Sequence, residues 1–322
     1  MTETPISSLA RDTSAERLIT MLTTAVGPQV GELLRDDQVV EVMLNPDGKL
    51  WVDRLGHGRE FTGLTVACHD AERIIKLVAS GTGAEVNETT PILSAEFPGT
   101  GSRFQGLLPP VVTAPVFTIR KKALMIFSLE DYVTQGILTG RQKEVLCQAV
   151  AEKKNVLVTG GTGSGKTTLV NALLNEIARS GDRIVIIEDT LELQCSAPDT
   201  VFLRAREGVA SMNDLLKATM RLRPDRIVVG EVRGGEALSL LKAWNTGHPG
   251  GCATVHANNA LGGLIRLEQL IQEAVVTVSR ELIAEAVDLV IHIERCGTGR
   301  IIREIVQVDG VEGGRYQASW IN

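Results

Sequence analysis

Hydrophobic and polar positions recur with two different periods in the first third of the chain. In residues 15–34 apolar side chains return every three or four positions, which predicts a helix with one buried face, and residues 71–79 predict a second helix. Short apolar runs broken by Pro and Gly predict strands at residues 39–44, 50–52, 92–97, 103–108 and 116–121. This mixture predicts a small α+β domain over residues 1–122.

A different pattern begins near Gln142, where helical stretches alternate with apolar runs. Such alternation is typical of a mostly parallel sheet covered by helices, so we expect an α/β domain over residues 141–322, joined to the first by a connection at 123–140. The expected strands are residues 156–159, 183–187, 226–229 and 252–255. Ligands of such folds bind at the carboxyl ends of the strands.

A glycine-rich loop follows the first of these strands and precedes a helical run. It fits the phosphate-binding pattern G-x-x-x-x-G-K-[ST], and its backbone N–H groups and helix N-terminus favour an anion. Lys166, which we expect to be a surface cation with no core role, would reach the β- and γ-phosphates, and the Thr167 hydroxyl would bind Mg²⁺. The predicted nucleotide-binding residues are Gly160, Gly161, Thr162, Gly163, Ser164, Gly165, Lys166, Thr167 and Thr168.

Acidic residues end two of the predicted strands. The run from Glu188 to Glu192 is expected at the tip of a strand next to the P-loop strand, and Glu231 ends the strand at 226–229. Carboxylates there would activate water or hold Mg²⁺, so Glu188 is assigned as general base and Glu231 as ligand of a Mg²⁺-bound water, with the two roles exchangeable. The alternatives are a helix N-cap at Asp189 and an ordinary ion pair between Glu231 and Arg233.

Basic residues and histidines lie near the same strands. Arg221 or Arg223 would stabilise the γ-phosphate, or would pair instead with Asp225 or Glu207. Two histidines flank the strand at 252–255, His248 before it and His256 after it. A neutral His256 would donate to a phosphate oxygen and register its loss; the alternative is a histidine that only satisfies local polar groups.

Composition narrows the class of protein. The 322 residues are 43% hydrophobic and 22% charged, as in ordinary globular proteins. Aromatic residues make up only 3% and the net charge is −6, which disfavours a binder of single-stranded nucleic acid. The five cysteines form no C-x-x-C pair, and the N-terminus has no apolar signal-peptide core. We therefore expect a cytoplasmic protein whose membrane association is peripheral.

Four elements in this order resemble the secretion traffic-ATPase superfamily. The P-loop is generic, whereas residues 188–192 resemble that family's Asp box, 224–233 its Walker B segment with glutamate, and 246–258 its His box. Residues 98–104 and 117–121 resemble N-terminal signatures of the type IV secretion and conjugation branch. The likeness covers roughly residues 35–300, and Leu191 departs from it where relatives often have proline.

The resemblance implies a RecA-like P-loop NTPase domain, ATP and Mg²⁺ as ligands, and a homo-hexamer. It also implies docking on inner-membrane components of a secretion channel, at the inner face of the cytoplasmic membrane. Arg103 and Arg120 would reach the phosphates from the first domain; alternatively they pair with carboxylates such as Glu85 or Glu96. A motor that opens and closes its domains is the first hypothesis. A DNA-threading ATPase and a nucleotide switch with negligible turnover remain the alternatives.

Overall fold

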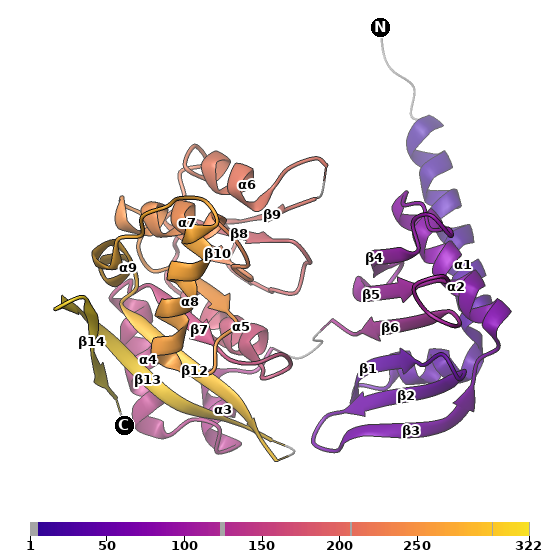
Figure 1. Cartoon of the computed structure of the whole chain (residues 1–322), viewed down its shortest axis with the longest axis horizontal. Helices are drawn as coiled ribbons and strands as arrows, with labels where there is room; N and C mark the ends of the chain where they lie inside the picture. The colour runs from indigo at the N-terminus through magenta and orange to yellow at the C-terminus, as the bar shows by residue number, and fades with distance from the viewer. Residues whose placement is uncertain (1–5, 123–125, 207, 298, 322) are drawn as a thin grey trace, which may run out of the picture. The chain divides into compact units, whose positions relative to one another are not determined.

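The chain folds into two compact units, residues 1–124 and 125–322 (Figure 1). The computed structural model describes residues 6–122, 126–206, 208–297 and 299–321, with side chains from residue 16 onward. Each unit has its own sheet and its own hydrophobic core.

The first unit is a six-stranded antiparallel sheet with two helices packed against it. The strand order is β3-β2-β1-β6-β5-β4. The helices are α1 (Ile6–Arg35) and α2 (Cys68–Thr82), and the strands are β1 (Val39–Leu44), β2 (Lys49–Arg54), β3 (Gly58–Thr65), β4 (Ile92–Phe97), β5 (Ser102–Leu107) and β6 (Val116–Arg120). The sequence predicts every one of these elements except β3. Most of the β3 side chains are exposed, so this edge strand lacks the buried positions that signal a strand.

Helix α1 is kinked although its apolar face continues across the kink. Gly27 has a non-helical φ of 76°, and Pro28 follows it. Leu22 and Val30, on either side, are both buried in the core of this unit. The periodicity of the side chains therefore predicts one helix, while the backbone changes direction inside it.

The second unit is an eight-stranded sheet in the order β14-β13-β12-β7-β11-β10-β8-β9. The strands from β12 to β9 in that order are parallel, and β13 and β14 are antiparallel additions at one edge. The strands are β7 (Val156–Thr159), β8 (Ile184–Glu188), β9 (Thr200–Arg204), β10 (Arg226–Val229), β11 (Cys252–Val255), β12 (Leu289–Cys296), β13 (Gly299–Glu312) and β14 (Arg315–Trp320).

Helices cover both faces of this sheet, as the α/β prediction requires. They are α3 (Leu129–Thr134), α4 (Gly140–Ala151), α5 (Lys166–Ile177), α6 (Met212–Thr219), α7 (Glu236–Asn245), α8 (Ala260–Gln272) and α9 (Arg280–Ala286). Along β7, Val156 and Val158 join the core beneath α3, α4 and α5, while Leu157 joins the core beneath α7, α8 and α9. The central strand is thus buried on both sides, which is why it reads as a continuous apolar run.

Three details differ from the sequence-based expectations. The connection expected at 123–140 is shorter, because Leu129, Tyr132 and Leu138 are buried in the core of the second unit. Strand β8 is not next to the P-loop strand, since β11 and β10 lie between them. The edge formed by β12, β13 and β14 was not predicted at all. Pairing order in a sheet depends on contacts between distant segments, which local periodicity does not report.

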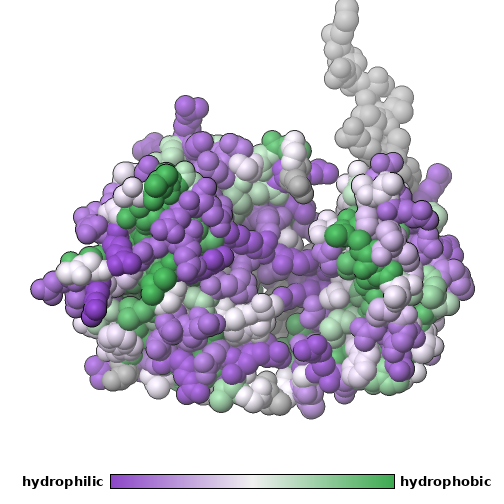
Figure 2. All heavy atoms as spheres, viewed as in Figure 1, coloured by the Kyte–Doolittle hydropathy of each residue, from purple (hydrophilic) through white to green (hydrophobic). Residues whose placement is uncertain are grey.

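Polar and charged side chains cover most of the face shown in Figure 2, with smaller apolar areas among them. Large apolar side chains that are exposed include Ile92 and Val276. Among the described residues, no helix is both long and apolar enough to cross a membrane.

Candidate active site

The P-loop leaves the carboxyl end of β7 and closes on the first turn of α5. Gly163 and Gly165 have φ values of 69° and 102°, in the left-handed region that glycine favours. Gly160 is equally constrained, because a Cβ there would lie 2.3 Å from the Ile293 carbonyl oxygen on β12. The glycines are therefore required both by the turn and by the close approach of a neighbouring strand.

Lys166 is the first residue of α5 and is buried, with 7% of its surface exposed. Its Nζ donates to the carbonyl oxygens of Gly160 and Gly161, each at 3.0 Å, and lies 3.3 Å from His256 Nδ1. The expectation of a surface cation without a core role is wrong. The lysine ties the loop to itself and reaches the segment that follows β11.

The hydroxyl of Thr167 donates to Glu192 Oε2 at 3.3 Å. The loop carrying Glu192 is held by the buried Asn171 of α5, whose Nδ2 donates to the Glu192 carbonyl at 3.4 Å and whose Oδ1 accepts from Gln194 N at 2.8 Å. The Thr167 hydroxyl at the start of α5 and the Glu192 carboxylate beside it are oxygen ligands of the kind that suits Mg²⁺. Thr168 follows on the same helix.

Glu188, the last residue of β8, turns inward. It is 2% exposed, and its Oε1 accepts from the backbone N–H groups of Glu192 and Leu193 at 3.0 and 2.9 Å. The structure thus places Glu192, rather than Glu188, against Thr167. The segment 189–199 is described throughout and contains no helix, so the predicted N-cap at Asp189 is wrong.

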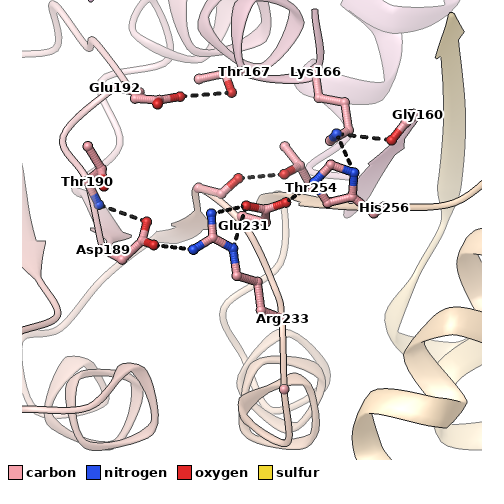
Figure 3. A network of polar contacts seen from close by, with 12 residues as sticks. Gly160, Lys166, Thr167, Asp189, Thr190, Glu192, Glu231, Arg233, Thr254 and His256 are labelled. Carbon is pink, nitrogen blue, oxygen red and sulfur yellow. Dashed lines mark hydrogen bonds and ion pairs between the residues drawn. The ribbon is translucent and has the colours of Figure 1, made fainter. Parts of the chain in front are cut away.

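Glu231 lies at the centre of a polar network that joins three strand ends (Figure 3). Its Oε1 is 2.6 Å from His256 Nε2, and its Oε2 accepts from Arg233 Nε at 2.6 Å. Arg233 is also ion-paired with Asp189 at the end of β8. The expected pairing of Glu231 with Arg233 is therefore present, within a larger arrangement that includes His256.

Lys166 and Glu231 contact the two ring nitrogens of His256. Lys166 has donors only, so Nδ1 of the ring accepts, and Nε2 carries the proton that is donated to Glu231. Burial lowers the pKa of His256, and the Lys166 ammonium lowers the pKa further, while Glu231 acts in the opposite direction. The proton at Nε2 is directed at Glu231, and the contact of His256 with a phosphate oxygen stays a prediction.

Arg221 is not brought to the P-loop of its own chain. Arg221 precedes β10 and so lies at the amino end of that strand, whereas the P-loop follows the carboxyl end of β7. Because β7, β11, β10 and β8 are parallel, these two ends are at opposite edges of the sheet. His248 also lies at the amino end, with Nδ1 2.8 Å from the Pro224 carbonyl oxygen. Asp225 accepts from the backbone N–H of Arg183, and Glu207, the other partner considered, lies outside the described residues.

Arg103 and Arg120 are directly opposite each other on β5 and β6 of the first unit. Glu96 on β4 is opposite Arg103, and Glu41 on β1 is opposite Arg120. The four side chains form one row across neighbouring strands, with both arginines between the two carboxylates. Of the carboxylates considered as alternatives, Glu96 is in register with Arg103.

Sequence reasoning did not single out Glu192, Arg233 or Asn171 as site residues. Glu192 was visible within the acidic run, but only the course of the loop shows which of these acids meets Thr167. Arg233 was considered only as an ordinary partner of Glu231. Asn171 carries no motif, because it acts by pinning a loop distant in sequence.

Comparisons with known proteins show the family to which the chain belongs. The family model described as "Type II/IV secretion system protein" matches residues 98–315. The conjugal transfer protein TrbB of Rhizobium radiobacter is 50% identical over 94% of both chains. The type IV secretion system protein VirB11 of Bartonella henselae is 31% identical over 81% of this chain and 84% of its own. A crystal structure of the pilus retraction motor PilT with ADP shares the fold, with a TM-score of 0.59 at 20% identity over 90% of this chain and 80% of that one.

Proposed function

Because the chain belongs to the family of type II/IV secretion system proteins, we propose that its ATPase activity drives a type IV secretion or conjugal transfer system. The proposal rests on the relatives and on a continuous line of contacts at the carboxyl edge of the sheet. Lys166 after β7, His256 after β11 and Glu231 after β10 touch one another in turn. Phosphate-binding, sensing and water-positioning groups thus meet from three separate strand ends.

When a nucleotide binds, Lys166 exchanges the carbonyl oxygens of Gly160 and Gly161 for the β- and γ-phosphates. Thr167 and Glu192 would hold Mg²⁺, which would supply positive charge to the phosphate oxygens. Glu192 replaces Glu188 in this role, because Glu188 is occupied with the backbone of the loop. Glu188 acts as a positioning residue that sets the course of the loop carrying Glu192.

Glu231 orients the attacking water, and the neutral His256 keeps one of its oxygens in place. A carboxylate oxygen has more than one lone pair, so Glu231 accepts from both His256 and a water molecule. We further propose that Arg103 and Arg120 of the first unit add positive charge to the phosphates. The cycle of binding and release moves the two units and so works on a secretion channel.

Steady-state phosphate release tests the proposal. We expect Glu231→Gln to bind ATP and to turn over roughly 10²- to 10⁴-fold more slowly, because it keeps the shape and removes the charge. Lys166→Ala should lose turnover together with nucleotide affinity. Lys76→Ala, which changes an exposed lysine of α2, is the control. Turnover of Glu231→Gln close to that of the wild type would remove Glu231 from the site.

A further inference from the structure

The backbone around Arg233 is held in place by the start of α7. The backbone N–H groups of Arg233 and Gly234 both donate to Glu236 Oε1, at 2.8 and 2.9 Å, and Glu236 is the first residue of α7. Gly235 fits closely against the turn that follows α8, since a Cβ there would lie 2.7 Å from the Ala274 Cβ. The start of α7 therefore fixes the point from which the Arg233 side chain projects.

From that point the guanidinium lies between two carboxylates, as Figure 3 shows. Nε donates to Glu231 Oε2 at 2.6 Å, and the terminal nitrogens are ion-paired with Glu231 and with Asp189. Asp189 follows β8 and Glu231 follows β10, which are neighbouring parallel strands. One planar side chain thus joins the ends of two strands, and a guanidinium has the several fixed donors that this requires.

The Glu231 carboxylate is held from two sides. His256 engages Oε1 and Arg233 engages Oε2, which fixes both the position and the rotation of the carboxylate plane. The Glu231 side chain is 16% exposed, whereas the side chains of Arg233 and His256 are about half exposed, so the carboxylate is the most enclosed group of the three. Removing the guanidinium would take away the cation that joins the like charges of Asp189 and Glu231 at adjacent strand ends.

We propose that Arg233 is a positioning residue for ATP hydrolysis, which holds the Glu231 carboxylate in its productive orientation by anchoring it to Asp189. It does not act on the phosphates itself. Nothing in the sequence motif requires this role, because an Arg two residues after an acid is equally suited to a solvated ion pair. The inference rests on the role proposed above for Glu231.

The role predicts a particular kinetic pattern. Arg233→Gln should lower kcat roughly tenfold to a hundredfold, as is typical when a residue that orients a catalytic group is removed, with little change in the KM for ATP. Arg233→Lys should recover only part of the loss, because a single ammonium does not span both carboxylates. Arg266→Gln, at a partly exposed arginine of α8 that contacts Gln269, is the matched control.

A double-mutant cycle separates positioning from a general structural effect. If Arg233 acts through Glu231, Arg233→Gln should add no further loss in the Glu231→Gln background. Asp189→Asn should reproduce part of the Arg233→Gln defect, and the two together should be less than additive. Thermal unfolding of each variant, measured on the full chain, should stay close to that of the wild type.

Several results would overturn the inference. They are a kcat of Arg233→Gln within twofold of the wild type, a raised KM with unchanged kcat, or a full additional loss in the Glu231→Gln background. If Glu231→Gln is slow while Arg233→Gln is normal, only the role of Arg233 fails. If Glu231→Gln itself turns over normally, the catalytic role of Glu231 fails with it.

Discussion

Asp182 is a carboxylate whose pKa is set by three hydrogen-bond donors. It lies before β8 and accepts from Arg226 Nε at 2.6 Å, Lys153 Nζ at 2.8 Å and Ser180 Oγ at 2.7 Å. Arg226 is only 1% exposed, so its charge needs this partner. Burial alone raises the pKa of Asp182, but the hydrogen bonds from Lys153, Arg226 and Ser180 outweigh it and bring the pKa to about 2.

A depressed pKa makes stability depend on pH. The ionised Asp182 adds to the free energy of unfolding above the unfolded-state pKa of 3.8, and this contribution is lost as the pH falls through about 2. We expect Asp182→Asn to lower the free energy of unfolding by roughly 2 kcal/mol at pH 7, and by roughly half as much at pH 3. Urea unfolding at both values, with the exposed Glu88→Gln as control, measures this. A loss that is equal at pH 7 and pH 3 would contradict it.

At the scale of single elements, the packing of α7 and β10 against the start of β11 requires a glycine, Gly251, immediately before β11. A Cβ on Gly251 would lie 2.1 Å from the Ile227 carbonyl oxygen and 2.2 Å from Trp244 Nε1. That indole N–H donates to the same carbonyl oxygen at 3.1 Å. The glycine therefore lets α7 and β10 approach the start of the strand that carries His256.

Gly251→Ala should force these elements apart. We expect a loss of roughly 1–3 kcal/mol in the free energy of unfolding of the second unit, with a change in the fluorescence of Trp244 in the folded state. Gly140→Ala is the matched control, because a Cβ at Gly140 meets nothing within 4 Å. Equal stability of the two variants would show that the contact around Gly251 relaxes without strain.

At the scale of the whole molecule, we propose that the chain works as a ring, most simply a hexamer. Arg221 lies at the opposite end of the sheet from its own P-loop, so any contact between its guanidinium and a γ-phosphate comes from a neighbouring subunit. An arginine supplied in this way makes hydrolysis depend on assembly. The ring itself is suggested by the family resemblance.

Light scattering should therefore report an assembly of about six chains, and phosphate release per chain should rise with protein concentration until assembly is complete. Nucleotide is expected to favour the assembled form. A monomer with full activity at every concentration would exclude this arrangement, and Arg221 would then have no part in hydrolysis.

The sequence by itself determined the local elements and the chemistry of the P-loop. The P-loop lies within eight consecutive residues, which include Gly160, Gly163, Gly165, Lys166 and Thr167. Its geometry therefore follows from a strand, a turn and a helix that neighbouring residues encode. The same holds for Glu231 and His256, each of which ends a short apolar strand. Parallel strands bring such ends to one edge of the sheet, where the sequence analysis expects ligands to bind.

The tertiary structure decided which acid meets Thr167 and what orients Glu231. Glu188 and Glu192 belong to one run, and only the course of the loop, pinned by Asn171, buries the first and turns the second toward the P-loop. Arg233 joins Asp189 to Glu231 because β8 and β10 are neighbours in the sheet. In the sequence, 37 residues lie between the end of β8 at Glu188 and the start of β10 at Arg226. Contacts of this kind arise from pairing between distant segments, and local sequence patterns carry no record of that pairing.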